Sequence, residues 1–454
     1  METPEAVVDR ADLQIAFDAL QAKLNPETVL FQYYDGEQPA VYSGEWLKKV
    51  LGGKAKNFSQ NWCVVTIDSV LDRLNLAGYA IEDEAIAAAV KTIWDNSEWN
   101  LESDSVHEAA LVTGEAFLII WPNKDGSPEA YYNDPRLCHL QYDAQFPRVP
   151  LWAAKRWVGD DEYYYMTMYY HDRLEYWRSA KKVKDVTDAK SFVPTEEGQS
   201  ENIYKQIPVF HFRTQRRHIQ GDLANVISLQ DAVNILLTDM LATAEYAAAP
   251  MRYVIGAGDG ELDDLENGPN KIWDIAGAVA GDGKVEVGQF AAADLGNYLL
   301  AMDSLAHSIG TITHTPKHYF LGASAGANLS GEALIAMEAP LNKKAADRIE
   351  VFGPVWMQAM AFALRIAGHT VDPLTILPKY DEPATVQPRT SAEILGMRVA
   401  AGVPLKSALR MEGMDDAEIE AIEQERTDEQ SAQQPRRIGL RDVVQPVAQE
   451  GDGE

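Results

Sequence analysis

One stretch of the sequence carries residues in a pattern typical of nucleophilic catalysis. Gly322, Ser324 and Gly326 match the G-x-S-x-G turn that exposes the serine of α/β-hydrolases, and Asp347 and His369 follow in that fold's triad order. The turn requires a buried strand before the serine and a helix directly after it. Here only HYFL precedes the turn, and the polar stretch ANLSG follows it. We therefore interpret the segment as a small-residue loop, with a serine hydrolase using Ser324 as the alternative function.

Other combinations that could support catalysis or bind metal are weak. His314 and His318 are four residues apart, but Pro316 lies between them and disfavours a shared helix face. The acidic residues between Asp259 and Glu266 lack the twelve-residue calcium-loop pattern. The sequence contains no phosphate-binding G-x-x-x-x-G-K-[ST] loop. We therefore expect a protein that is not an enzyme and that has no cofactor and no metal.

The charge of the chain restricts the partners it can have. It carries 69 acidic and 40 basic residues, a formal net charge of −29, whereas proteins that grip DNA phosphates usually show basic patches. Either the chain never meets nucleic acid, or it touches DNA without holding it. We find neither a signal peptide nor an apolar run long enough for a membrane span. Cys63 and Cys138 match no metal or redox spacing, which favours reduced thiols and assembly in a reducing cytoplasm.

The first half of the chain predicts a mixture of helices and strands. A helix is expected from residue 12, followed by the turn-rich aromatic stretch LFQYYDGEQPAVYSG, and a second helix over residues 80–98. Strands are expected at Ala116–Trp121, Trp152–Val158, Glu162–Arg178 and Ile207–Phe212, with an exposed polar loop over residues 179–200. Residues 1–221 therefore predict an α/β unit, and the chain as a whole an α+β fold.

The second half predicts long helices separated by loops. Helices are expected over 222–249, 295–312 and 331–368, the last kinked at Pro340 and at Gly353-Pro354. Apolar residues three and four apart on the first two helices predict helix-on-helix packing that neighbouring subunits complete. These packing residues are Val233, Leu236, Met240, Met302, Leu305 and Ile309. The proline-rich residues 369–390 predict an extended linker, further helical sequence follows, and residues 431–454 have a disordered, acidic composition.

Several motifs in a fixed order resemble the portal proteins of tailed bacteriophages, in the SPP1-type branch of siphophages. The early motifs are Tyr33-Tyr34-Asp35-Gly36, the strand from Gly114 to Trp121, Asn133-Asp134-Pro135 and Pro208–Phe212 leading to Gly221. The most specific is Thr315-Pro316, Leu321-Gly322 and Asn328-Leu329-Ser330-Gly331-Glu332, continued by Glu338, Lys343-Lys344 and Arg348. The likeness covers roughly residues 20–430.

This resemblance implies an order of parts along the chain. Residues 1–221 would form an α/β wing, 222–249 and 295–312 a helical stem, 250–294 a small α/β clip, and 313–330 a tunnel loop. Residues 331–368 would return to the wing, 369–430 would form a linker and helical crown, and 431–454 a tail. The crown is short and the acidic tail long for this family, which puts crown contacts in doubt.

The resemblance also implies function and partners. Family members form closed rings, usually of twelve subunits, at one capsid vertex, through which double-stranded DNA is packaged and ejected. The implied partners are the terminase large subunit, a head-completion or adaptor protein, scaffold and the major capsid protein, with assembly in the host bacterial cytoplasm. Another virion ring, such as a head–tail adaptor, is a further alternative, although adaptors are much shorter. The tunnel-loop residues nearest DNA would be Lys317, His318, Gly322, Ser324, Gly326 and Asn328.

Overall fold

A computed structural model describes most of the 454 residues and divides the chain into two compact units. The described residues are 10–39, 45, 59–215, 218–247, 252–255, 286–289, 294–321, 331–383, 388–411, 414 and 416–433. The first unit contains Met1–Ala384 and the second Thr385–Glu454. The mixture of helices and sheets confirms the predicted α+β class.

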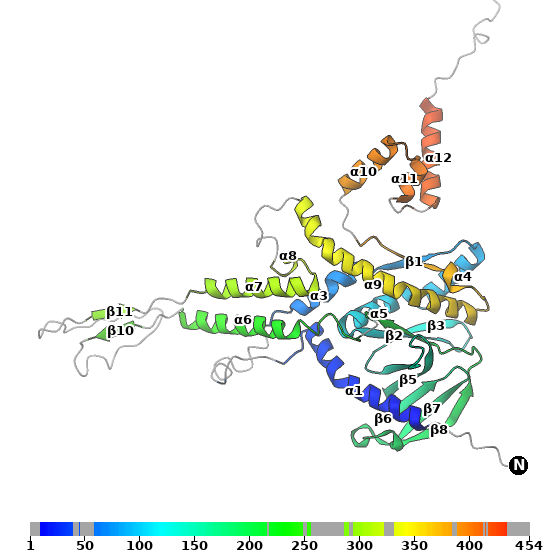
Figure 1. Ribbon diagram of the computed structural model, residues 1–454, viewed down its shortest axis with the longest axis horizontal. Coiled ribbons are helices and arrows are strands. Elements are labelled where there is room, and N and C mark those ends of the chain that lie inside the picture. Colours follow the sequence, from blue (N-terminus) through cyan, green and yellow to red (C-terminus); the bar gives the residue numbers. More distant parts are fainter. Residues whose placement is uncertain are drawn as a thin grey trace, which may run out of the picture. The chain divides into compact units, whose positions relative to one another are not determined.

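The largest sheet of the first unit is an antiparallel meander of five strands, in the order β4-β5-β6-β7-β8. The long helix α1 (Arg10–Asp35) lies along this sheet (Figure 1). Its residues Leu13, Phe17 and Leu20 are buried against Trp152 and Met166 of the sheet. The strands are β4 (Cys138–Tyr142), β5 (Pro150–Val158), β6 (Tyr163–Tyr169), β7 (Arg173–Lys182) and β8 (Phe192–Glu201).

A second sheet has three antiparallel strands in the order β3-β2-β9 and belongs to the main core. Its central strand β2 is buried from Glu115 to Ile120, because helices and the larger sheet cover it. A short pair, β1 with β12, joins residues far apart in the sequence. These strands are β2 (Glu115–Pro122), β3 (Pro128–Asn133), β9 (Val209–Arg213), β1 (Leu76–Ala80) and β12 (Leu377–Tyr380).

Helix α9 (Gly331–Ile366) is the central helix of the main core. Leu341, Phe352 and Trp356 of α9 are fully buried among α3 (Trp62–Leu71), α4 (Glu84–Asn96) and α5 (Trp99–Thr113). The stretch Ala333–Ile366 is long and apolar enough to cross a membrane, but half of its most apolar window is buried inside the protein. That burial is what a core helix requires, since its apolar face packs on other elements.

Helices α6 (Ile227–Ala247) and α7 (Gly296–Thr313) lie side by side and extend from this core (Figure 1). They run antiparallel, because the Thr243 hydroxyl near the end of α6 meets the Tyr298 hydroxyl near the start of α7 at 3.0 Å. The strands β10 (Arg252–Ile255) and β11 (Glu286–Gln289) pair antiparallel between them in the sequence. After α7 comes the single turn α8 (His318–Leu321).

The second unit contains three helices. They are α10 (Pro388–Ala400), α11 (Leu405–Met411) and α12 (Asp416–Gln433). The chain leaves α10 at Gly402, whose φ of +94° is the left-handed conformation that glycine adopts most easily, and Pro404 precedes α11. The single helical segment expected at this point is therefore two helices.

The structure corrects several predictions about secondary structure. The predicted loop over 179–200 is wrong: it contains the end of β7 and the start of β8, whose polar residues lie on an exposed edge strand. The stretch Leu30–Asp35 is helical, because Tyr33 packs into the core and its hydroxyl donates to Asp231 at 2.7 Å. Helix α6 begins at Ile227 and not at Asp222. The expected linker over 369–390 contains β12.

Candidate functional site at the base of the helical hairpin

The α6–α7 hairpin is joined to the core by its own apolar residues. Val233 on α6 and Met302 and Ile309 on α7 are buried in the main core. Leu236 and Leu305 pack against that core as partly buried residues, and Met240 is half-buried. The apolar residues that predict helix-on-helix packing thus lie between α6, α7 and the core of the same chain. Contact of these six residues with a neighbouring subunit remains a prediction.

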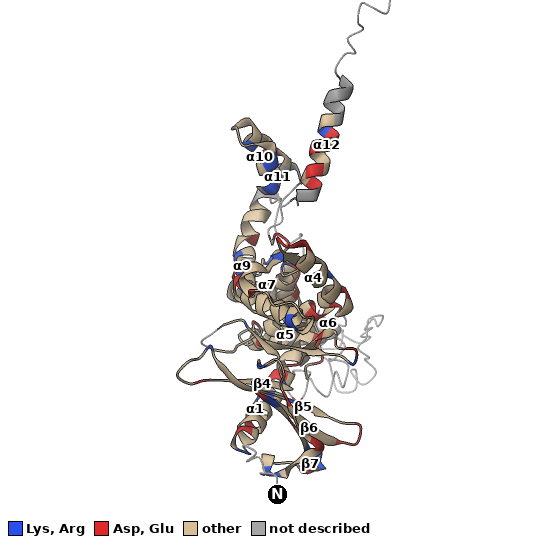
Figure 2. Cartoon of the chain, turned by 90° about the vertical axis from the view of Figure 1, so that its right-hand side faces the viewer, with Lys and Arg blue, Asp and Glu red and all other residues tan. Residues whose placement is uncertain are grey.

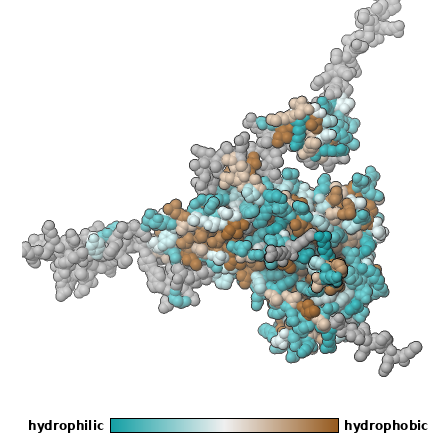
Figure 3. All heavy atoms as spheres, in the orientation of Figure 1, coloured by the Kyte–Doolittle hydropathy of each residue, from teal (hydrophilic) through white to brown (hydrophobic). Residues whose placement is uncertain are grey.

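Three apolar residues of α7 are exposed. Leu299 is 60% exposed, Leu300 69% and Ile312 49%. Figure 3 shows hydrophobic residues gathered over the region of α6 and α7. Leu299 and Leu300 are adjacent near the start of α7, before its first buried residue, Met302, and together they form an apolar surface suited to a partner.

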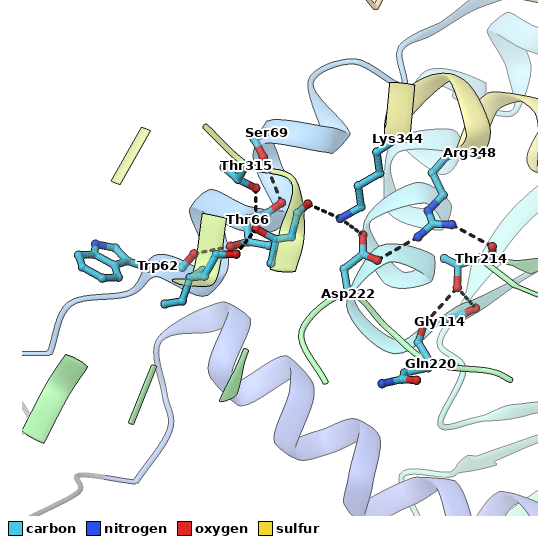
Figure 4. Close-up of polar contacts among 12 residues, drawn as sticks. Trp62, Thr66, Ser69, Gly114, Thr214, Gln220, Asp222, Thr315, Lys344 and Arg348 are labelled. Atoms are coloured by element: carbon cyan, nitrogen blue, oxygen red, sulfur yellow. Dashed lines mark hydrogen bonds and ion pairs between the residues drawn. The ribbon is translucent and has the colours of Figure 1, made fainter. Parts of the chain in front are cut away.

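A cluster of charged residues ties α9 to the base of the hairpin (Figure 4). Asp222 forms an ion pair with Lys344 at 2.9 Å and accepts from Arg348 at 3.0 Å, and all three side chains are at most 14% exposed. Lys344 also donates to the Thr313 carbonyl at 3.0 Å, and Arg348 to the Thr214 carbonyl at 2.9 Å. One helix thereby holds both the segment before α6 and the end of α7.

The same junction depends on two close approaches of the backbone. A Cβ atom on Gly221 would lie 1.8 Å from the Val112 carbonyl oxygen, so no larger residue fits without movement of α5. A Cβ atom on Gly310 would lie 2.6 Å from the Thr315 carbonyl oxygen. This second approach lets the chain fold back after α7, where His314 adopts a φ of +64°. The glycines therefore fix where α6 begins and where α7 ends.

A second polar cluster anchors α8 between α3 and α9. Arg73 donates to the Tyr319 hydroxyl at 3.0 Å, to Asn342 at 2.7 Å and to the Ser69 carbonyl at 2.8 Å. The Tyr319 hydroxyl in turn donates to Glu338 at 3.0 Å, and Arg73 approaches Glu338 at 3.4 Å. Arg73 thus holds the segments on both sides of residues 322–330.

The predicted DNA-proximal residues are only partly placed by the structure. The Lys317 amine forms an ion pair with Asp303 of α7 at 2.6 Å, and its side chain is 31% exposed. The His318 ring lies edge-on to Tyr319, with the centroids 4.8 Å apart. Gly322, Ser324, Gly326 and Asn328 lie outside the described residues.

The surroundings of the G-x-S-x-G stretch do not fit a hydrolase. Residues 318–321, which would have to form the strand before the nucleophile, are the helical turn α8. Asp347, the candidate triad acid, pairs with Lys343 on the exposed side of α9. Within the described ranges, no group of three or more histidine, cysteine, aspartate and glutamate side chains could hold a metal ion.

An open recess of about 330 Å³ lies beside the Asp222 cluster. Lys343, Lys344 and Arg348 line it together with Asp222 and Asp347, so each cation faces an acid of the same chain. Its lining contains no cysteine or serine, and its histidine, His314, is exposed. The charged residues that line the recess therefore pair with one another and join parts of the fold.

A third ionic cluster joins α1 to two sheets and was missed by the sequence reasoning. Glu115 of β2, 1% exposed, pairs with Lys23 of α1 and accepts from His211 of β9 at 2.6 Å. Lys23 also donates to the Cys138 carbonyl of β4 at 3.2 Å. The nearby Glu27 is 7% exposed. No local pattern identifies this cluster, since its members are far apart in the sequence.

Burial shifts the pKa values of this cluster in opposite directions. Burial raises the pKa of Glu27 to about 8, and Lys23 offsets only part of that effect. Burial also raises the pKa of Glu115, but the hydrogen bond from His211 and the charge of Lys23 outweigh it and bring that pKa to about 2. Burial lowers the pKa of His211, so a neutral ring donates from Nε2 to Glu115 while Nδ1 faces the Tyr142 hydroxyl at 3.2 Å.

The described residues thus present helix junctions and exposed leucines at the start of α7, the features of a structural protein that assembles with others. Comparison with known proteins identifies the family. The pattern of the family described as "Phage portal protein, SPP1 Gp6-like" matches residues 19–432. The chain therefore belongs to this family of phage portal proteins. Its members are structural components of the virion and not enzymes, which does not favour the hydrolase alternative.

Two curated relatives carry the same description, "Portal protein". That of Mycobacterium phage D29 is 32% identical over 217 residues, which cover 45% of this chain and 44% of the relative. That of Mycobacterium phage L5 is 30% identical over 387 residues, covering 80% of this chain and 76% of the relative. The chain thus matches less than half of the first relative's length and about three quarters of the second's. A solved chain from the neck of an empty gene transfer agent particle aligns with a TM-score of 0.46 at 12% identity, covering 80% of this chain and 92% of that one.

Proposed function

We propose that copies of this chain form a closed ring, most simply of twelve subunits, around the channel through which phage DNA is packaged and ejected. Membership of the portal family supports this proposal. The partners would be the terminase large subunit, a head-completion protein, scaffold and the major capsid protein. The ring would assemble in the cytoplasm of the host bacterium and remain at one vertex of the capsid.

The described elements fit the order of parts that such a ring requires. In this proposal α6 and α7 are the stem, the β10–β11 pair belongs to the clip, and the segment from α8 to the start of α9 contains the tunnel loop. Residues 1–221 form the wing, α9 returns to it, and α10–α12 form the crown. No catalytic group is needed, because a separate motor would supply the energy for DNA movement.

The observation that carries the proposal is the exposed apolar face that Leu299 and Leu300 form at the start of α7. Leu299 is 60% and Leu300 69% exposed on a hairpin that buries Val233, Met302 and Ile309 in the core. Contact between this face and the next copy is heterologous, and such contacts close without open ends only in a ring.

Substituting Leu299→Glu and Leu300→Glu together tests this face. The wild-type chain should sediment as one large closed oligomer and show a central hole in negative-stain images. The double variant should remain monomeric with an unchanged circular dichroism spectrum, since neither leucine is part of the core. Leu374→Glu is the matched control, because Leu374 is 73% exposed elsewhere in the same unit. Rings of wild-type size from the double variant would contradict the proposed interface.

Contact between Lys317 and the DNA backbone is a second part of the proposal. Because the Lys317 amine forms an ion pair with Asp303, its contact with the DNA backbone should be weak and should be lost as the salt concentration rises. Asp303→Asn should free the amine and increase the salt dependence of DNA retention, whereas Lys317→Gln should reduce it. Lys190→Glu, at an exposed site on the short 3-10 turn before β8, is the control. Changes in the same direction for both variants would rule out this contact.

A further inference from the structure

The second unit has too small a core to hold three helices by itself. Among its described residues, only Ala408, Leu409 and Ile419 are buried apolar residues. Chains of this size rarely bury enough apolar surface to fold alone without a disulfide, a metal or a partner. Both cysteines of the chain lie in the first unit, and no metal-binding group is found among the described residues. A partner is one source of the stability that this unit needs.

Apolar residues on the surface of this unit mark where a partner would pack. Met397 is 67% exposed, Met411 62%, Val399 41% and Met414 36%. Flexible, polarizable methionine side chains adapt their shape to other proteins and are frequent in binding surfaces. An exposed group of this kind on a unit with a minimal core is poorly explained by solubility alone.

The charges of the unit are divided between its helices. From Pro388 to Met411, α10 and α11 contain four basic residues and one acidic residue, whereas α12 contains seven acidic residues and one basic residue. Figure 2 shows the basic residues on α10 and α11 and the acidic residues on α12. Inside the unit, Lys406 of α11 and Glu423 of α12 are 3.9 Å apart.

We propose that the acidic α12 of one copy docks against the basic α10–α11 pair of the next copy, covering the exposed methionines. The two surfaces are different and complementary, so the contact is heterologous and repeats around a closed ring. This inference rests on the proposed ring and deepens it, because it assigns a second interface, separate from the apolar face of α7. The occupant is a second copy of this chain, since both complementary surfaces are on the chain itself.

Charge reversal tests the proposal in the full-length chain. One variant carries Glu420→Lys and Glu425→Lys on α12, and the other carries Lys406→Glu and Arg410→Glu on α11. Each variant alone should need at least a tenfold higher protein concentration than wild type for half-maximal ring formation. An equimolar mixture should recover wild-type assembly, because each reversed helix then meets a complementary neighbour. Glu82→Lys and Glu84→Lys, on and beside α4 of the first unit, form the control pair with the same change in charge.

Cross-linking covers the case in which charge reversal unfolds the helices. Both native cysteines are buried, so single cysteines introduced by Met411→Cys and Glu420→Cys are the only exposed thiols. Mixed rings of the two variants should yield disulfide-linked dimers, and rings of either variant alone should yield far fewer.

The outcomes separate the two proposals. A wild-type chain that never forms rings contradicts the proposed function. Wild-type rings with no mixed cross-link, or with no rescue by mixing folded charge variants, overturn this interface alone and leave the ring in place. Binding of a separate acidic or basic protein to the second unit of intact rings would likewise overturn it.

Discussion

Two buried ionic junctions in the first unit are built with opposite balances of charge. At the base of the hairpin, one carboxylate, Asp222, faces two cations, Lys344 and Arg348. Between α1 and the sheets, two carboxylates, Glu27 and Glu115, lie near the single ammonium group of Lys23. Each junction connects segments that are far apart in the sequence.

The difference shows how a fold deals with surplus buried charge. The extra cation at the hairpin is satisfied by neutral acceptors, because Lys344 and Arg348 also donate to backbone carbonyls. The extra acid near α1 has a buried oxygen, Glu27 Oε2, with no hydrogen-bond partner, and burial raises its pKa to about 8. A surplus cation can thus be fixed by hydrogen bonds, whereas the surplus acid takes up a proton near neutral pH.

The substitution Glu115→Gln should have the largest effect on stability. It keeps the side-chain shape but leaves the largely buried Lys23 ammonium without a counter-charge, which costs about 3 kcal/mol of unfolding free energy. Urea unfolding measures the change in the unfolding free energy. The experiment uses a protein concentration at which sedimentation shows a single oligomeric species. Glu82→Gln, an exposed glutamate before α4, should change the free energy by less than about 0.5 kcal/mol. Equal values for the two variants would show that the Lys23–Glu115 pair contributes nothing.

The substitution Asp222→Asn should have a smaller effect, about 2 kcal/mol, because both cations keep their carbonyl acceptors. The matched control is Asp347→Asn, whose pair with Lys343 is exposed and worth at most about 0.5 kcal/mol. If Asp222→Asn lowers the unfolding free energy as much as Glu115→Gln does, the backbone carbonyls do not compensate for the lost carboxylate. The proposed difference between the two junctions would then be wrong. Hydrogen exchange should show faster opening at the start of α6 and the end of α7.

The parts of the fold that could be predicted from sequence are those with local signals. Helix α4 follows from its apolar periodicity and from Asp83, whose side chain caps the Ala85 and Ile86 amides. Strand β2 follows from its apolar run. Strand β8 was missed because an exposed edge strand with glutamates, Pro194 and Gly198 has the composition of a loop.

The charged junctions could not be predicted, because their partners come together only in three dimensions. Lys23 and Glu115 are separated along the chain by helices α3, α4 and α5 and strand β1, and nothing near either residue indicates burial. The sequence around Lys317 likewise does not indicate its ion-pair partner, because Asp303 lies a few turns back on α7. Conversely, the chance match around Ser324 shows that a local motif carries little weight without the strand that must precede it.

The pH dependence of stability isolates the surplus acid, and its change between neighbouring pH values is the smallest of the three, about 1 kcal/mol per pH unit. The pKa of Glu27 rises from 4.5 in the unfolded chain to about 8 in the fold, so the folded state holds a proton that unfolding releases. The stability from this group is fully present below about pH 4.5 and is lost as the pH rises to about 8. Wild-type unfolding free energy should therefore fall by about 1 kcal/mol per pH unit relative to Glu27→Gln between pH 5 and 8.

The control for this slope is the other acid of the same junction. The pKa of Glu115 falls to about 2, so its contribution is present above about pH 4.5 and is lost only as the pH drops toward 2. Glu115→Gln should therefore lower stability at every pH from 5 to 8 but reduce the slope only in part, because burial is the largest cause of the raised pKa of Glu27 and the charge of Glu115 a smaller one. Unfolding curves at pH 5, 6, 7 and 8 for the wild type and both variants make the comparison. Parallel pH profiles for the wild type and Glu27→Gln would mean that Glu27 is ionised in the fold, and the two junctions would then differ only in geometry.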